Sequence, residues 1–473
     1  MAVVTQTQRS AKGGWRELLG PRNLGASTVL AGGVALYATN DFLTISLLPS
    51  AVTEIGGQRL YAWVTTVYLV ASVVAATTVG PVLTKLGPRW AYVSGLVVFG
   101  VGSATCAVAP SMEFLLVGRV VQGAAGGLLA GLGYAVINAA LPQSLWTRAS
   151  ALVSAMWGVG TLVGPAAGGL FAQFGSWRWA FSALAILTAA MALLVPFALP
   201  ARESGDRRQA DRIPVWSLLL LGAAALAISV AGVVHDVVTT AVLLVAGVAL
   251  VALFLVVDRR TEASVLPPTA FRPGPLKWIY LTLGVLMAAT MADMYVPLFG
   301  QRLAHLAPVA AGFLGVSVAV GWTISEITSA SLTRTATIVR VVTAAPLVMA
   351  TGLAVAALTQ VVDAPGVVVA VWVGALIVTG TGVGAAWPHL SAWAMGSGSS
   401  PAEGRTASAA INTVQLMCGA FGAGVAGVVV NLTERGDATA AHWLFATMAV
   451  LAALGGVASY RASRDRTARS GVG

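Results

Sequence analysis

Charged residues are scarce in this chain of 473 residues: only 9% are Asp, Glu, Lys or Arg, whereas 57% are hydrophobic. This composition excludes a soluble globular protein, because apolar segments of membrane-spanning length recur too often. Both cysteines, Cys106 and Cys418, fall inside apolar segments, which predicts neither a structural disulfide nor a metal cluster. The sequence contains no Gly-x-x-x-x-Gly-Lys-Ser/Thr loop, so we expect neither ATP-driven chemistry nor any cofactor.

The chain contains many long apolar segments, and each is long enough to span a bilayer as a helix. They predict an all-α polytopic membrane protein with a six-helix bundle (1–200), cytoplasmic segments with two linker helices (201–273), a second six-helix bundle (274–460) and a basic tail (461–473). The fourteen expected spans lie near 27–49, 60–84, 90–109, 113–140, 147–172, 178–199, 215–234, 238–257, 277–301, 307–331, 338–360, 366–395, 405–430 and 440–460.

Basic residues gather on one side of these spans. With a cytoplasmic N-terminus, the outer loops hold only four of the 27 Lys and Arg residues, namely Arg59, Arg178, Arg302 and Arg435. The positive-inside rule therefore places both termini in the cytoplasm. The net charge of +10 follows from this pattern, so we expect no nucleic-acid partner. Arginine-rich loops and abundant Ala, Val and Gly favour a bacterial source, and hence the inner membrane.

Asp41 and Arg119 are isolated charges inside two of the spans. An ionised group in hydrocarbon is expensive, so it persists mainly when paired, facing a wet cavity or carrying protons. We expect proton coupling through Asp41, with Arg119 as its partner, and through Asp293 and Glu326 in the second half. Other interpretations stay open: Arg119 as a hydrogen-bond hub, Asp41 in a static pair or touching substrate only, and Glu326 reaching the interface.

The two six-helix blocks resemble each other. Gly33–Asp41 (GVALYATND) and Gly284–Asp293 (GVLMAATMAD) each place an acid late in the first helix of their block. Leu83–Lys85 (LTK) and Leu332–Arg334 (LTR) each end a second helix. Because many transporters are built from repeats with the binding site between them, this indicates a central site at the repeat interface.

Polar residues recur every three or four positions on several spans, which places them on one helix face. Such faces point away from lipid, toward a cavity or toward hydrogen bonds with neighbouring helices. We expect the substrate cavity to be lined from the first, second, fourth and thirteenth spans by Tyr37, Asn40, Thr44, Tyr61, Thr65, Tyr68, Gln122, Asn412 and Gln415.

Four segments carry recognisable motifs: YAWVTTVYLVAS (61–72), LLVGRVVQGAAGG (115–127), GTLVGPAAGG (160–169) and INTVQLMCGAFGAG (411–424). Together they resemble the major facilitator superfamily, in particular its fourteen-helix drug:proton antiporter branch. The resemblance implies two six-helix bundles that rock around a central site.

Two of the resembling segments are expected to control conformation. In the fifth span, small residues permit close helix packing and the proline bends the helix, whether for antiport or for tight packing alone. The loop GPVLTKLGPR (80–89) matches the family pattern except at Thr84, where the family has an acid that holds the halves together. The residues concerned are Gly80, Lys85, Gly87, Arg89, Gly160, Gly164, Pro165, Gly168 and Gly169.

The residues and the resemblance together indicate a transporter rather than an enzyme. We expect a monomeric, proton-coupled exporter of hydrophobic or amphipathic small molecules, of the multidrug-efflux type that confers antibiotic resistance. Alternatives are export of a lipid or envelope metabolite, proton-coupled uptake, and a non-transporting membrane sensor or scaffold.

Overall fold

Every regular element is a helix in the part of the chain that this computed structural model describes, residues 14–200, 213–234, 236–261, 264–266, 268–395, 401–433 and 436–470. Thirteen of the described helices are long and apolar enough to cross a membrane. A further helix, α2 (Leu24–Ile55), is 32 residues long and carries the polar pair Asn40 and Asp41 near its middle. Counting α2 gives fourteen spans, and an all-α polytopic fold is confirmed.

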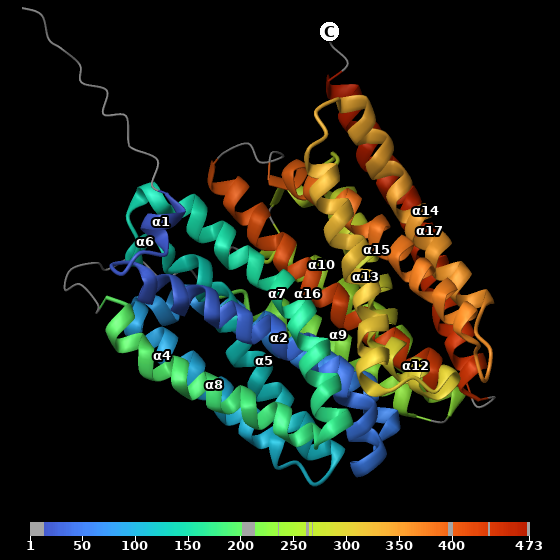
Figure 1. Cartoon of the computed structure of the whole chain (residues 1–473). Coiled ribbons are helices and arrows are strands. Elements are labelled where there is room, and N and C mark those ends of the chain that lie inside the picture. The colour runs from blue at the N-terminus through green and yellow to red at the C-terminus, as the bar shows by residue number, and fades with distance from the viewer. Residues whose placement is uncertain are drawn as a thin grey trace, which may run out of the picture.

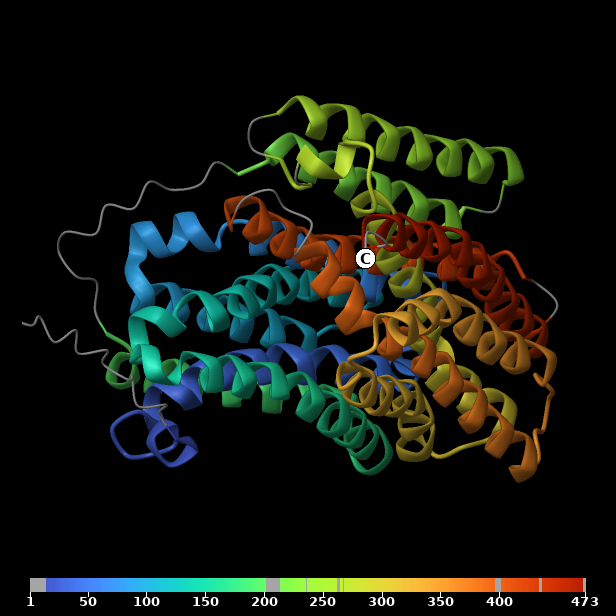
Figure 2. The same ribbon diagram turned by 90° about the horizontal axis from the view of Figure 1, so that it is seen from above.

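The spans divide into two bundles with a pair of helices beside them (Figures 1 and 2). The short elements α1 (Trp15–Leu18), η1 (Gln58–Leu60), α6 (Ile137–Ala140), η2 (Gln143–Leu145) and η3 (Pro268–Phe271) lie between spans. The first bundle comprises α2, α3 (Tyr61–Ala76), α4 (Val79–Ala107), α5 (Met112–Ala135), α7 (Trp146–Phe174) and α8 (Trp177–Ala198).

The second bundle begins with an interrupted span, in which the 3-10 turn η4 (Met291–Tyr295) separates α11 (Leu276–Thr290) from α12 (Val296–Ala304). The linker pair consists of α9 (Val215–Val233) and α10 (Val237–Arg260). The remaining helices of the second bundle are α13 (Pro308–Ala330), α14 (Thr335–Leu358), α15 (Gly366–Met395), α16 (Pro401–Asn431) and α17 (Asp437–Ser470).

Both ends of the described chain lie at the same end of the molecule, which we call the terminal end (Figure 1). The opposite end, here the far end, is where the bundles are joined. Between described residues of the two bundles, all hydrogen bonds lie at the far end, with lengths of 2.8 to 3.1 Å. These bonds link Tyr61 to Met294, Arg302 to Gln58 and Asn431 to Arg59.

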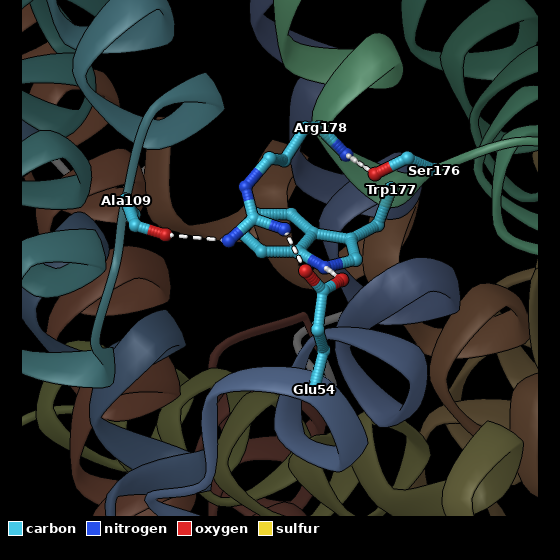
Figure 3. Close-up of polar contacts among 5 residues, drawn as sticks. All are labelled: Glu54, Ala109, Ser176, Trp177 and Arg178. Atoms are coloured by element: carbon cyan, nitrogen blue, oxygen red, sulfur yellow. Dashed lines mark hydrogen bonds and ion pairs between the residues drawn. The ribbon is translucent and has the colours of Figure 1, made fainter.

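At the far end, an ion pair fastens three helices of the first bundle (Figure 3). Glu54, near the end of α2, accepts hydrogen bonds from Trp177 Nε1 (2.7 Å) and from Arg178, both in the first turn of α8. Arg178 also donates to the carbonyl of Ala109, just beyond α4, at 2.9 Å, and its guanidinium lies 4.4 Å from the Trp177 ring. These contacts hold the far ends of α2, α4 and α8 together.

The linker helix α9 packs along the seam between α3 and α16, one from each bundle. Trp63 Nε1 on α3 donates to the carbonyl of Ser229 at 3.0 Å, and the Ser229 hydroxyl meets Thr66 at 3.3 Å. On the other side, a Cβ at Gly232 would lie 2.9 Å from the backbone nitrogen of Val428. The second linker helix, α10, covers α9 from outside (Figure 2).

Several span ends differ from the expected ones, most clearly between the second and third spans and at the last helix. The second span was expected to reach residue 84, but α3 ends at Ala76 and α4 begins at Val79. The break between spans comes within α4, at Gly87, whose φ of 76° is a left-handed conformation that glycine adopts readily. The last helix continues to Ser470 instead of ending near 460, because its alanines and arginines favour helix.

Glycines on α7 bring this helix against the backbone of α2. A Cβ at Gly160 would lie 2.8 Å from Thr39 N, and one at Gly164 would lie 2.9 Å from Leu43 N. A Cβ at Gly168 would lie 2.6 Å from the Leu43 carbonyl oxygen. The backbones of α2 and α7 are therefore in direct contact on both sides of Asp41, with no space between them for larger side chains.

Replacing one of these glycines should therefore destabilise the protein. We expect Gly164→Leu to cost about 1–3 kcal/mol through overpacking, and to lower the melting temperature of the detergent-purified protein. Gly158→Leu on the same helix is the matched control, because a Cβ there meets nothing within 4 Å. Equal melting temperatures for the two variants would contradict this account of the α2–α7 contact.

Candidate functional site

Arg119 on α5 is fully buried inside the first bundle. Its Nε donates to the carbonyl of Val64 on α3 at 3.2 Å, and its Nη1 donates to Thr44 on α2 at 3.2 Å and to Gln122 at 3.0 Å. The guanidinium carbon also lies 4.0 Å from the centre of the Tyr68 ring, a cation–π contact. Arg119 is therefore a hub that joins α2, α3 and α5.

Gln122 extends this network to two more side chains. Its Nε2 donates to Asn40 Oδ1 at 3.2 Å and to the hydroxyl of Ser103 on α4 at 2.9 Å. Asn40, Thr44 and Gln122 were expected to line the substrate cavity, yet all three are almost completely buried and bond to one another or to Arg119. Ser103 was missed, because a single serine in an apolar span has no distinguishing signal.

Asp41 lies next to Asn40 but outside the network. Arg119, its expected partner, makes no ion pair with it, and Asp41 Oδ1 is buried without a hydrogen-bond partner among the described residues. Tyr37, one turn earlier, stacks on Tyr68 with ring centres 5.6 Å apart and meets the edge of Trp157 on α7 at 5.3 Å. On the polar face of α2, Asn40 and Thr44 therefore bond within the bundle interior, whereas Tyr37 packs against the aromatic rings of Tyr68 and Trp157.

Asp293, the counterpart of Asp41 in the second bundle, lies in the 3-10 turn η4. Its Oδ1 is also buried and lacks a hydrogen-bond partner among the described residues. A Cβ at Gly315 on α13 would lie 3.5 Å from this oxygen. Asp293 borders a small pocket between the bundles, whose other lining residues are Phe42, Ile45, Ser46, Thr161, Pro165, Pro297, Gly312, Gly315, Val316 and Ala319.

The motif at 160–169 connects the Asp41 helix to the second bundle. The Pro165 carbonyl accepts a hydrogen bond from Ser46 on α2 at 3.2 Å. A Cβ at Gly312 on α13 would also lie 3.2 Å from the Pro165 carbonyl oxygen, and one at Gly169 would lie 2.6 Å from Val309 Cα. One side of α7 therefore packs on α2, and its far-end portion packs on α13.

Glu326 lies on the terminal half of α13, within a cluster of aromatic and polar side chains. Its Oε2 accepts a hydrogen bond from Trp322 Nε1 at 2.8 Å, and the Trp322 ring lies 5.4 Å from the ring of Trp387 on α15. Ser329 and His389 meet nearby, with Oγ and Nε2 2.9 Å apart. His389 thus has a structural partner between α13 and α15.

The segment 80–89 shows what Thr84 does in place of the family acid. Its hydroxyl donates to the carbonyl of Gly80 in the same helix at 2.9 Å, so it is satisfied locally. Arg89 Nε donates to the carbonyl of Leu199 at the end of α8, at 3.1 Å. Gly87 provides the break in α4, and Lys85 is exposed. In this conformation Thr84 makes no hydrogen bond to any described residue of the second bundle.

The other predicted cavity residues lie in different environments. Tyr61 stacks on Tyr295 at 4.8 Å and so belongs to the far-end contact between the bundles. Thr65 is buried on α3, whereas on α16 Asn412 is exposed and Gln415 is half-buried. No group of three His, Cys, Asp or Glu side chains in the described part of the chain is placed to hold a metal ion.

Comparisons with known proteins agree with this architecture. The family model for the Major Facilitator Superfamily matches residues 30–423. The chain belongs to this superfamily. It is a membrane transporter with many spans, as expected from the sequence.

Individual relatives give closer matches. A Mycobacterium tuberculosis protein named "Probable multidrug-efflux transporter" is 62% identical over 463 residues, covering 97% of this chain and 98% of its own. A Bacillus subtilis protein named a multidrug transporter is 24% identical over 60% of this chain and 53% of its own. Among solved structures, a bacterial homologue of the human lysosomal transporter Spinster matches with TM-score 0.64 and 14% identity, covering 94% of this chain and 97% of its own, which shows a shared fold.

The Arg119 network generates a stability prediction. Arg119→Lys should destabilise the protein by about 1–3 kcal/mol, because one ammonium group cannot reach all the buried acceptors that the guanidinium satisfies. Thermal unfolding in detergent measures this. Arg178→Lys, at a partly exposed ion pair, should cost about 0–1 kcal/mol. A melting temperature for Arg119→Lys equal to that of the wild type would show that the network is dispensable.

Proposed function

We propose that this protein is a proton-coupled exporter of hydrophobic or amphipathic small molecules, of the multidrug-efflux type, that works by alternating access. The relative named a multidrug-efflux transporter supports this, since the two chains align over nearly their full lengths at 62% identity. The packing of the motif at 160–169 against both α2 and α13 also supports it, because this helix can transmit movement between the bundles.

The observation that carries the proposal is a pair of half-buried acids, each with one carboxyl oxygen that is buried and has no hydrogen-bond partner among the described residues. Asp41 and Asp293 occupy the matching first spans of the two bundles, and within the described part of the chain neither Oδ1 atom receives a hydrogen bond. An unpaired carboxylate in such surroundings is costly, and taking a proton removes most of that cost. Exposure to water favours release of the proton. Opening and closing of the site around these acids can therefore be coupled to proton movement.

In the proposed cycle, Asp41 takes a proton from outside and releases it inside, and substrate competes with the proton. Arg119 acts on Asp41 indirectly, by fixing the position of α2. It bonds to Thr44 directly, and it bonds to Gln122, which in turn bonds to Asn40. Asp293 is the second proton-binding acid. We assign the terminal end to the cytoplasm of a bacterial cell, with both termini inside, on the positive-inside rule. The unit of transport is the monomer.

The movement consists of the two bundles rocking about the contact between α7 and α13. The far-end bonds of Tyr61, Gln58 and Arg59 break when that end opens, while the terminal end closes. Close packing along Gly160, Gly164 and Gly168 makes α2 follow α7, so that Asp41 moves with the rocking bundle. Substrate and proton thereby reach opposite sides of the membrane in alternation.

Loss of the carboxyl group of Asp41 should abolish proton-driven export. We expect Asp41→Asn in proteoliposomes to reduce the transport of ethidium driven by a pH gradient at least about tenfold, because the amide cannot carry a proton. Asp293→Asn should cause a smaller reduction. The initial rate of ethidium movement after imposing the gradient measures both effects.

The matched control is Glu113→Gln, an acid-to-amide change at an exposed position in the first turn of α5. Export by this variant should match the wild type. If Asp41→Asn still transports ethidium in response to the gradient, Asp41 is not the coupling acid. If the wild type shows no proton-driven movement of any amphipathic compound, the protein is a scaffold, or it transports a lipid or metabolite.

A further inference from the structure

One face of α13 runs from the seam between the bundles to the terminal end. Gly315 and Ala319 on this face border the pocket that contains Asp293. Trp322 and Glu326 follow at intervals of three and four residues, so they continue the same face. Glu326 is eleven residues beyond Gly315, roughly 16 Å along the helix. Gly315 is buried, whereas Trp322 and Glu326 are half-buried, so the face becomes accessible toward the terminal end.

Two indole rings and one carboxyl group are held in fixed positions on this accessible part. Trp322 Nε1 donates to Glu326 at 2.8 Å, which orients both side chains. A Cβ at Gly384 on α15 would lie 2.8 Å from the backbone carbonyl carbon of Trp322, so the two helices are in direct contact and the Trp387 ring lies beside that of Trp322. One turn beyond Trp387, the hydroxyl of Ser391 is buried with no partner among the described residues.

No positively charged side chain in the described part of the chain pairs with this group of residues. Glu326 forms no ion pair with any described residue, and the indole donor occupies one of about four acceptor sites on its carboxylate. Partial burial strengthens the attraction between a carboxylate and a cation. The faces of tryptophan rings attract cations as well, and they also bury apolar surface. The chemistry that fits is an organic cation with an aromatic or apolar body.

We propose that Trp322, Glu326 and Trp387 form a capture site that selects positively charged amphipathic substrates at the terminal end of the second bundle. The inference rests on the proposed export function and adds to it a site separate from the proton-binding acids Asp41 and Asp293. Glu326 pairs with the charge of the substrate instead of carrying the transported proton. Substrate enters along α13 and α15 before it reaches the seam.

Equilibrium binding to the purified full-length protein in detergent tests this proposal. Ethidium, a permanent cation, is compared with Nile red, a neutral dye. Glu326→Gln keeps an oxygen that can accept the Trp322 hydrogen bond but removes the charge. We expect it to lower the affinity for ethidium relative to Nile red about tenfold. Trp387→Leu should lower the same ratio about threefold. Glu113→Gln, an exposed acid on α5, should leave the ratio as in the wild type.

The proposal is overturned if Glu326→Gln weakens both dyes equally or leaves ethidium binding intact. Should Glu326→Gln fail to give a monodisperse protein, two other variants test the proposal. Glu326→Asp keeps the charge and should keep the preference for ethidium, whereas Trp387→Leu keeps Glu326 and should still lower that preference. No proton gradient is present in this assay, so the measured affinities for the two dyes do not depend on whether transport is coupled to protons. Conversely, if Glu326→Gln leaves the preference for ethidium unchanged while the wild type still transports Nile red in response to a proton gradient, only the capture site is overturned and the proposed export function stands.

Discussion

The buried guanidinium of Arg119 is the constraint on which the first bundle depends. A permanent charge in the middle of a span has to be satisfied inside the protein, and here neutral acceptors on α2, α3 and α5 together with the Tyr68 ring do so. These bonds fix the rotation of α2 about its axis, because Thr44 bonds to Arg119 directly and Asn40 bonds to Gln122. The neighbouring residue, Asp41, makes no ion pair with the arginine.

Asp41 Oδ1 has no hydrogen-bond partner in the described part of the chain, and this is why we propose Asp41 as the coupling acid. An ion pair stabilises the ionised form of a carboxyl group and so opposes protonation. A buried carboxyl group without a partner is instead stabilised by a proton when it is dry and by hydration of its ionised form when water reaches it. Asp293 has the same property at the seam between the bundles. Close packing of α7 on α2 and on α13 connects the two sites structurally, and in the proposed cycle this contact carries a change around one acid to the other bundle.

The sequence predicted the features that depend on long apolar segments and isolated charges. It located the spans and picked out Asp41, Arg119 and the glycines of α7. It did not predict how Arg119 is satisfied, because acceptors such as Ser103 and the Val64 carbonyl have no pattern along the chain. The early end of α3 at Ala76 and the position of Tyr61 against Tyr295 depend on a turn and on packing between distant helices.

Proton release on substrate binding tests the central claim most directly. Purified protein in weakly buffered detergent solution is mixed with ethidium, and a pH indicator reports the protons released per bound dye. If Asp41 exchanges its proton for substrate, the wild type releases protons in proportion to binding, and Asp41→Asn binds ethidium with much less release. Release of equal size from both proteins, or none from the wild type despite binding, would contradict the account.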